Sequence, residues 1–391
     1  MRSIVQSLID LFLRYFWRFA PRGVLLALPG TSRQFGPPRH VASWSEYQKQ
    51  YSSSWHLVYG PSSTRLPAPF YCADSRIKPL PSQLVWPEFG VAEIPSGRLL
   101  DHFGWVVGQK DTFLAEFCGK GFSKQSAVNR LLKLKPPEHM DGITLNLSSA
   151  FSFNNFFHTI VDALSRWHLV HQAGYTWDCF DHVVLPMHQS RMTREIERAI
   201  GIPAEKVIRL TWHQQLECAT LVQPSFPGYH AWTAWWVPSF YRTLFPPCSG
   251  SRRRKLYVPR RGVRQITNAA ELETRLAALG FEEFDPTQGL GSIATLQEAT
   301  HIVGVHGAAL ANLVFCRTGT RVLELMPTDI AYHENSTFYT SLCAAAGLPY
   351  GVLVGRSQRN RLSSISPQTD ADFTVPIVDF EQAIRALLEE S

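Results

Sequence analysis

The 391-residue sequence has no uninterrupted apolar run of the length that a membrane-spanning helix needs, which is about 18 residues. We therefore expect no transmembrane helix. No small-residue cleavage site follows the apolar N-terminal stretch, so we expect no cleavable signal peptide. The sequence shows no internal repeat, which argues against a solenoid or a propeller.

Cysteines are few and scattered. The seven lie at positions 72, 118, 179, 218, 248, 316 and 343, with no Cys-x-x-Cys pair and no Cys/His cluster at metal-ligand spacing. An odd, dispersed set in a chain of this length favours free thiols and a reducing compartment. We expect a cytoplasmic protein without a bound metal.

Charged residues are also sparse, at 18% against 45% apolar residues, and the net charge is +6. This composition predicts folded cores in a chain long enough for two domains. The mild basic surplus fits an anionic small ligand or an anionic membrane surface, whereas nucleic-acid binding favours denser basic stripes. No Gly-x-Gly-x-x-Gly follows a predicted strand, which disfavours a dinucleotide-dependent oxidoreductase.

Composition and pattern divide the chain into three parts. Residues 1–90 contain a helix over 1–20 and an irregular extension rich in Pro, Ser, Trp and Tyr. In that helix polar side chains recur every four residues between apolar ones, which suits a membrane interface or the protein's own core. Strands and helices alternate over 91–248 and again over 249–391, after a linker near 246–255. We expect an α/β fold with a parallel sheet in each of these two lobes.

In the first lobe, a predicted helix over 154–167 carries His158 and Asp162 four residues apart. This spacing places both side chains on one helix face, where the carboxylate can orient the imidazole or share its proton. The remainder of the helix is strongly apolar and predicts burial, so the pair suits catalysis or a buried structural hydrogen bond.

In the second lobe, the stretch from His301 to Asn312 predicts a strand, a tight turn at Gly304–Gly307 and a helix. Such a turn favours an anionic ligand at the helix N-terminus, although a buried unit with a simple chain reversal has the same pattern. Another strand ends at Arg260, Arg261 and Arg264, and Glu324 lies on a third. Because ligands bind at the carboxyl ends of parallel strands, the arginines suit a diphosphate and Glu324 suits a ribose. Ordinary surface ion pairs are the alternative.

Four aromatic or imidazole side chains lie close together at His230, Trp232, Trp235 and Trp236. We expect His230 and Trp232 to contact an acceptor sugar, with a place in the core as the alternative, whereas the core is favoured for Trp235 and Trp236.

Three motifs together resemble glycosyltransferase family 61. They are Val303–Leu313 with Gly319–Glu324, Asn155-Phe156-Phe157-His158 with Asp162 and Arg166, and Tyr257–Gly262. The similarity covers about residues 140–355, and its bacterial members are often capsular polysaccharide biosynthesis proteins. Ala309 and Ala311 depart from the Gly and the Ser or Thr that are usual there, and Ser165 from a frequent Pro.

The resemblance implies a GT-B-like architecture with two Rossmann-type lobes facing a cleft and a final helix, over 379–388, that crosses back to the first lobe. It implies inverting transfer from a nucleotide-diphosphate sugar, usually UDP-linked, to a glycan or lipid-linked saccharide, without an obligatory metal. The product would belong to surface polysaccharide biosynthesis. The polar stripe of the helix over 1–20 separately predicts peripheral attachment to the cytoplasmic face of a membrane.

The site residues follow from these motifs. Asp162 is the expected general base, and His158 orients it or replaces it. The expected donor contacts are Arg260, Arg261, Arg264, His306, Gly307, Ala308, Asn312 and Glu324, and Asn155 joins the acceptor contacts. A glycan- or nucleotide-binding protein of the same fold, without chemistry, is the alternative.

Overall fold

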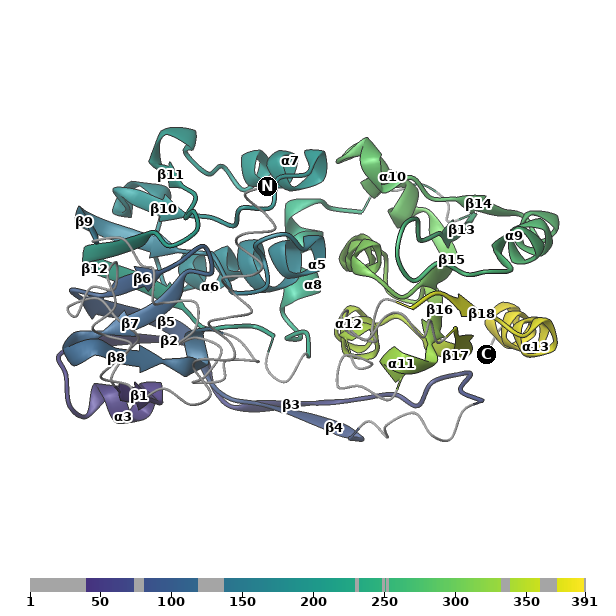
Figure 1. Ribbon diagram of the computed structural model, residues 1–391, viewed down its shortest axis with the longest axis horizontal. Coiled ribbons are helices and arrows are strands. Elements are labelled where there is room, and N and C mark those ends of the chain that lie inside the picture. The colour runs from purple at the N-terminus through teal and green to yellow at the C-terminus, as the bar shows by residue number, and fades with distance from the viewer. Residues whose placement is uncertain are drawn as a thin grey trace, which may run out of the picture.

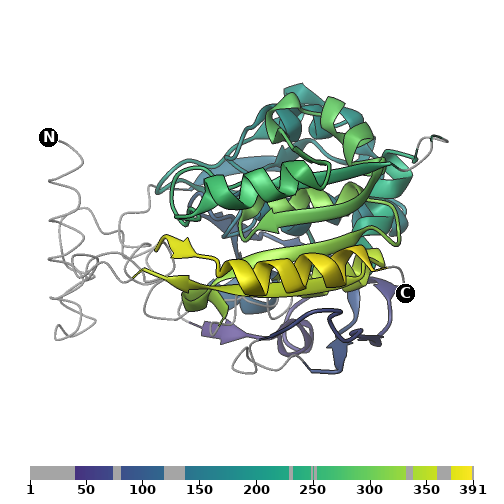
Figure 2. The same cartoon turned by 90° about the vertical axis from the view of Figure 1, so that its right-hand side faces the viewer.

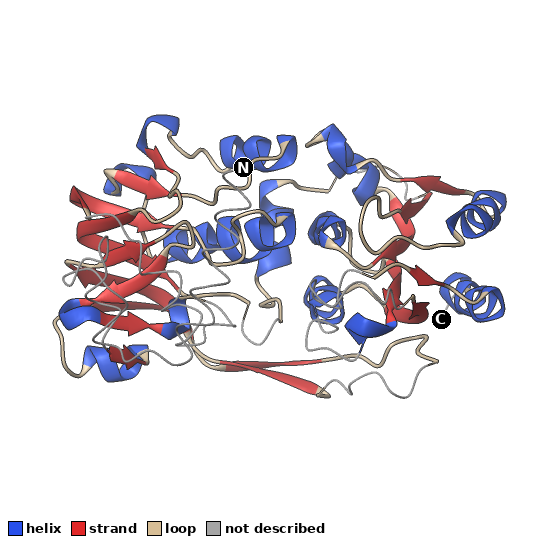
Figure 3. Ribbon diagram, viewed as in Figure 1, coloured by secondary structure: helices blue, strands red, loops and turns tan. Residues whose placement is uncertain are grey.

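The computed structural model describes residues 40–73, 81–118, 137–228, 232–247, 250, 253–331, 338–358 and 371–389. The predicted helix over 1–20 and His230 lie outside these ranges. Two sheets lie side by side, one of ten strands and one of six, and a two-stranded ribbon runs below them (Figure 1). Helices fill the space between the sheets and also cover the outer face of the six-stranded sheet, as Figure 3 shows.

The ten-stranded sheet has the order β1-β8-β7-β6-β12-β9-β10-β11, and β5 pairs with both β12 and β2. Its strands are β1 (His40–Ala42), β2 (Ser54–Tyr59), β5 (Phe89–Pro95), β6 (Arg98–Leu100), β7 (Trp105–Gly108), β8 (Thr112–Leu114), β9 (Glu138–Asn146), β10 (His182–Val184), β11 (Val207–Ile208) and β12 (Gln215–Pro224). Strands β3 (Ser62–Arg65) and β4 (Gln83–Trp86) form the ribbon.

This sheet is mixed, so the expectation of a parallel sheet in the first lobe is only partly correct. Strands β12, β9, β10 and β11 run parallel. Strands β5 and β6 are antiparallel to β12, and β6, β7 and β8 form an antiparallel meander. The short connections over 101–104, between β6 and β7, and over 109–111, between β7 and β8, permit only antiparallel neighbours, because a parallel pair needs a long crossover.

The helical segments around this sheet are short. They are α3 (Trp44–Gln48), α5 (Phe156–His158), the π turn η3 (Thr159–Ala163), η4 (Leu164–Arg166), α6 (Trp167–Gln172), α7 (Arg191–Ala199) and α8 (Val237–Leu244), with single 3-10 turns η1 (Gln109–Asp111), η2 (Ala115–Phe117), η5 (Trp177–Cys179) and η6 (Ala204–Lys206). None of the helices in the described ranges has the length and apolar character of a membrane span.

The six-stranded sheet, in the order β14-β13-β15-β16-β17-β18, confirms the predicted alternation of strands and helices. Its first five strands are parallel, and β18 is antiparallel. The elements are β13 (Arg254–Val258), α9 (Ala269–Ala278), β14 (Phe281–Glu283), η8 (Pro286–Gln288), α10 (Gly291–Gln297), β15 (Ala299–Val305), η9 (Ala308–Phe315), β16 (Arg321–Pro327), α11 (Thr328–Ala331), α12 (Phe338–Ala346), β17 (Tyr350–Ser357), β18 (Phe373–Thr374) and α13 (Ile377–Leu388).

The core between the sheets is continuous. One apolar cluster joins residues of the first half, such as Ile160 and Tyr241, with Leu310 and Val322 of the second half. A separate cluster lies under α9 and α13, where Val303, Leu323 and Phe380 meet. Successive side chains of the parallel strands therefore point alternately toward the junction of the two halves and toward the outer layer of helices.

Helix α13 does not cross back to the first half, so that expectation is wrong. It packs on β16 and β17 beside α9 (Figure 2) and buries Phe380, Ile384 and Leu387 there. Instead, a segment of the first half extends to the second half and pairs with it there. Phe70 N donates to Tyr350 O and Val352 N to Tyr71 O, so the segment over 70–72 lies along the start of β17.

One local expectation also changes. The extension is not irregular throughout, because β1, β2, β3 and β4 form within 40–90, where short strands with half-exposed faces carry little periodicity. Asn268 precedes α9, and its side-chain amide exchanges two hydrogen bonds with the backbone of Val375. None of the six cysteines in the described ranges forms a disulfide, as expected.

Candidate active site

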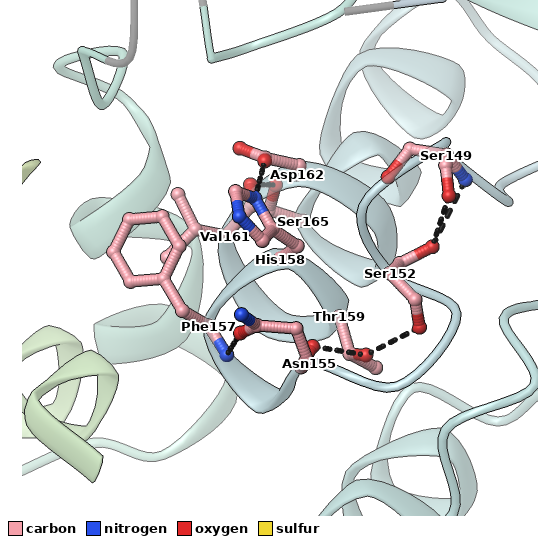
Figure 4. Close-up of polar contacts among 9 residues, drawn as sticks. All are labelled: Ser149, Ser152, Asn155, Phe157, His158, Thr159, Val161, Asp162 and Ser165. Atoms are coloured by element: carbon pink, nitrogen blue, oxygen red, sulfur yellow. Dashed lines mark hydrogen bonds and ion pairs between the residues drawn. The ribbon is translucent and has the colours of Figure 1, made fainter. Parts of the chain in front are cut away.

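The predicted helix with His158 and Asp162 forms, but its middle turn has π geometry. Asn155 caps the segment, and its Oδ1 accepts from Phe157 N at 2.9 Å. The π turn over Thr159–Ala163 follows α5 (Figure 4). Side-chain donors bond its carbonyls: Tyr241 Oη donates to Ile160 O at 2.8 Å and Ser165 Oγ to Val161 O at 2.5 Å. Single π turns often mark functional sites.

His158 and Asp162 form a closed pair on this turn. His158 Nδ1 lies 2.5 Å from Asp162 Oδ2, and the two side chains are 14% and 3% exposed. Asp162 Oδ1 is buried without a hydrogen-bond partner. A Cβ atom added to Gly228 would lie 2.7 Å from that oxygen, so the backbone after β12 covers it. The imidazole is thus the solvent-facing member of the pair.

Arg166, one turn further on, is completely buried. Its Nη2 donates to Ser148 O at 2.5 Å. Burial lowers the pKa of this guanidinium to about 10, while the charge of Asp162 acts in the opposite direction. Arg166 therefore lies close enough to Asp162 for the two charges to interact.

A second histidine and carboxylate pair lies at the turn after β15. His306 Nδ1 is 2.5 Å from Glu324 Oε1, and Tyr350 Oη donates to Glu324 Oε2 at 2.5 Å. Glu324 is fully buried, because it lies between Val322 and Met326 on the face of β16 that meets the other half. Both carboxylate oxygens are engaged, which argues against a ribose contact for Glu324.

Arg260 lies directly against this turn. Its Nη1 donates to His306 O at 3.3 Å and its Nε to Val263 O at 2.6 Å. A Cβ atom on Gly307 would come within 1.8 Å of Arg260 Nη1, so only glycine leaves room for the guanidinium. Arg264 has a left-handed backbone with φ of +61°.

The charges of Arg260 and Arg264 both affect the pKa of Tyr339. The Oη of Tyr339 donates to Gly307 O at 2.5 Å. Burial raises the pKa of Tyr339, and the two guanidiniums lower it. Arg261 points elsewhere, to Glu283 at 3.0 Å and Glu273 at 3.6 Å. The structure therefore brings two of the three predicted arginines to the turn.

The small-residue run after the turn is a 3-10 helix, η9, instead of the expected α-helix. Leu310 N is bonded to Gly307 O within the first turn. Ala308 is half-buried, whereas Asn312 is 2% exposed and its Nδ2 donates to Ala309 O at 2.8 Å. The buried side chain of Asn312 therefore bonds the backbone of η9, whereas Ala308 lies at the start of η9, next to the turn.

Aromatic rings connect the two pairs. At the start of α12, the Phe338 ring lies 5.7 Å from His158 and 5.1 Å from Phe157. The Tyr339 ring lies 5.6 Å from Phe157 and 5.4 Å from His306. Helix α5 packs on η9, so residues nearly 150 positions apart in the sequence form one site.

The two predicted acceptor residues in the described ranges, Asn155 and Trp232, are both partly buried. The Oδ1 of Asn155 is used as a helix cap, and Trp232 packs edge-on at 6.1 Å from Trp86. Trp236 is 1% exposed and confirms its core assignment, and Trp235 packs against the Tyr59 ring at 4.7 Å. An exposed ring that sequence reasoning missed, Phe151, lies 5.1 Å from His158.

Phe151, Gly228, Tyr339 and Tyr350 complete the site, and no local motif singled them out. Phe151 precedes the recognised motif by only four residues, so the Phe-rich run over 151–157 is the one available signal. In the described ranges no three His, Cys, Asp or Glu side chains gather as metal ligands would. The expected independence from a metal stays a prediction.

Comparison with known proteins finds one family that resembles the middle of the chain. No curated protein matches it. The family model described as Glycosyltransferase 61 matches residues 156–323, from the first residue of α5 to the middle of β16. The match includes both histidines of the site and the two arginines at the turn. Over these residues the chain is similar to glycosyltransferase family 61, which supports a role in glycosyl transfer.

Proposed function

We propose that this protein is an inverting glycosyltransferase in which His158 is the general base and Asp162 holds it in place. The observation that carries this assignment is the geometry of the pair. Oδ2 of Asp162 is committed to His158 Nδ1, and Oδ1 is covered by the backbone of Gly228. A base must lie within hydrogen-bond reach of the hydroxyl that it deprotonates. The Nε2 atom of His158 meets this need better than either oxygen of Asp162.

The donor diphosphate binds at the turn after β15, between Arg260, Arg264 and His306. Guanidinium groups hold phosphate oxygens in a bidentate manner. The turn also lies at the carboxyl end of a parallel strand, where ligands of such sheets bind. Glu324 serves His306 in this scheme, because its carboxylate fixes the orientation of the ring and is not free for a sugar.

The reaction is a direct displacement. The acceptor hydroxyl loses its proton to His158 Nε2, and its oxygen forms the new bond to the anomeric carbon. The bond from that carbon to the phosphate oxygen breaks, and its electron pair leaves with the nucleoside diphosphate. Arg260 and Arg264 stabilise the charge that develops on the departing group. Attack from the face opposite the diphosphate inverts the anomeric configuration.

The donor is a nucleotide-diphosphate sugar, for which the family resemblance implies UDP, and the acceptor is a glycan or lipid-linked saccharide of surface polysaccharide biosynthesis. Phe151 supplies an exposed ring beside His158 on which an acceptor sugar can stack. Peripheral attachment through residues 1–20 remains part of the proposal. Equal recovery of the full chain and a chain without these residues in liposome flotation would contradict it.

The assignment predicts the effect of two substitutions. A thermal-shift screen of UDP-sugars first identifies the donor, since a ligand of the native state raises its stability. With that donor, His158→Ala lowers kcat by about 10² to 10⁴. Asp162→Asn also lowers kcat, because an amide cannot stabilise the protonated ring. Neither change alters donor affinity, because the proposal assigns donor binding to Arg260, Arg264 and His306. The readout is release of UDP in the presence of acceptor.

His139→Ala is the matched control. His139 Nδ1 lies 3.3 Å from Glu217 Oε2, but its side chain is 76% exposed and remote from the turn. Its loss leaves kcat unchanged. A His158→Ala protein with full activity would contradict the base assignment. A chain that binds UDP-sugars and never releases UDP with any acceptor would instead be a binding protein.

A further inference from the structure

A cavity of about 320 Å³ lies in the first half, outside the residues used so far. Its size falls within the range of ligand pockets, roughly 300–1,000 Å³. Five aromatic rings line it, from α3, β2, η2 and the two ends of neighbouring strands: Trp44, Trp55, Phe89, Phe117 and Phe226. The rings are held in fixed positions, since Trp44 packs at 5.7 Å from Trp55 and 5.3 Å from Phe117.

Polar groups stand at exposed positions of the same cavity. Glu88, Glu116 and Ser45 are exposed residues of its lining. Glu88 forms no hydrogen bond or ion pair with any residue that the structure describes. Glu116 accepts from Trp44 N at 2.9 Å through Oε2. The cavity thus combines apolar ring surfaces with carboxylate acceptors.

This combination matches the chemistry of a neutral sugar ring. A pyranose has C–H groups that pack on aromatic surfaces and hydroxyl groups that donate to carboxylates. Two carboxylates at the opening disfavour fatty acids, phosphates and nucleotides, because like charges repel. A purely apolar occupant would leave these polar groups unused.

The cavity is connected to the catalytic helix by a short segment. Ser225 and Phe226 line the cavity directly after β12, and Gly228 covers Asp162 Oδ1 two residues later. A Cβ atom on Gly228 would lie 2.7 Å from Asp162 Oδ1 and 2.8 Å from Phe226 Cε1. The wall of the cavity and the carboxylate of the pair are therefore in contact with the same backbone.

We propose that this cavity is a saccharide subsite that holds a neutral sugar ring of the acceptor, distant from the ring that receives the new sugar. The name acceptor rests on the proposed function, whereas the binding of a saccharide does not. An acceptor of two or more rings then binds at both Phe151 and the cavity, and a monosaccharide acceptor loses the second contact.

Binding is tested on the full chain without donor, by saturation-transfer NMR with cellobiose, lactose and N,N′-diacetylchitobiose. Ser45→Tyr places a ring at an exposed lining position and abolishes saccharide binding. Glu88→Gln keeps the shape of the cavity but removes the charge, and lowers affinity about tenfold because hydrogen bonds to charged acceptors are the stronger ones. Ser52→Tyr is the matched control, since Ser52 is exposed and outside the lining. It leaves binding unchanged.

The outcomes separate this inference from the proposed function. Binding that is equal in Ser45→Tyr and wild type, or the absence of binding by all three disaccharides, overturns the subsite and leaves the transferase assignment intact. Binding of the amphipathic, anionic dye anilinonaphthalene sulfonate in the cavity, together with no binding of any of the three saccharides, also overturns it. If His158→Ala retains full kcat while Ser45→Tyr loses saccharide binding, the base assignment fails and the subsite stands.

Discussion

At the scale of single residues, the site consists of two histidines whose Nδ1 atoms each face a buried carboxylate. Asp162 holds His158, and Glu324 holds His306. A carboxylate at Nδ1 leaves Nε2 as the ring nitrogen that is open to another partner. The two carboxylates differ in their second oxygen. Glu324 is also bonded by Tyr350, whereas Oδ1 of Asp162 has no hydrogen-bond partner. Both oxygens of Glu324 therefore have hydrogen-bond partners, whereas Asp162 keeps one buried oxygen without a partner beside the proposed base His158.

Gly307 lies so close to Arg260 that a larger residue would displace the guanidinium. This contact leads to a prediction for the affinity of the donor. Gly307→Ala would place a methyl group 1.8 Å from the present position of Arg260 Nη1. The guanidinium has to move, so the variant binds the donor at least about tenfold more weakly, a loss of about 1.4 kcal/mol. Isothermal titration with the donor measures this.

Gly291→Ala is the control for Gly307→Ala. Gly291 begins α10, and a Cβ atom there would meet nothing within 4 Å. Alanine also favours a helix over glycine by up to about 1 kcal/mol, so the control retains its stability and donor affinity. Equal donor affinity in both variants would show that Arg260 does not hold the diphosphate.

At the scale of elements, the π turn of the catalytic helix decides the site. A π turn has one more residue than an α turn, so it changes the direction of every side chain beyond it. His158, Asp162 and Arg166 remain close through this turn, and Tyr241 on α8 bonds one of its carbonyls. The packing of α8 therefore contributes to the geometry of the catalytic pair.

Tyr241→Phe tests this contribution. The variant loses one buried hydrogen bond to Ile160 O, at a cost of about 1 kcal/mol in the free energy of unfolding. Because the π turn loosens, kcat falls about tenfold, while donor affinity is unchanged. Chemical denaturation measures the first effect and steady-state kinetics the second.

Tyr71→Phe supplies the comparison for Tyr241→Phe. Tyr71 Oη donates to Asp379 O at 3.2 Å, in the second half and away from the catalytic helix. This variant keeps its kcat. A Tyr241→Phe enzyme with normal kcat and reduced stability would indicate that the hydroxyl supports packing only.

At the scale of the whole molecule, the two halves share one core. The apolar cluster between the sheets contains residues from both, and the segment over 70–72 pairs with β17. Phe70 also lies under the guanidinium of Arg321, 4.6 Å from its ring centroid. Large hydrophobic interfaces oppose independent motion of the parts that they join.

The shared core predicts that the two halves unfold together. Calorimetry of the full chain shows one transition whose calorimetric and van't Hoff enthalpies agree. Ligand-induced stabilisation by the donor then shifts the entire transition. Two separate transitions, with only one shifted by donor, would mean that the second half is an independent domain.

The sequence by itself determined the local structure of the second half and the identity of its turn. The strand that precedes Arg260 and the strand that carries Glu324 are predicted from short apolar runs between turn residues, which depend only on neighbours in the chain. The structure has these strands at Arg254–Val258 and Arg321–Pro327. The His158–Asp162 contact was predictable for the same reason, since helical spacing brings positions four apart together.

Only the tertiary structure decided which atoms face substrate. Gly228, sixty-six positions after Asp162, covers its Oδ1, and no local pattern contains that contact. Strand alternation placed Glu324 on one face of β16, but packing against the other half decided that this face is buried. The roles of the two carboxylates therefore depend on long-range contacts, which the spacing of residues in the sequence does not encode.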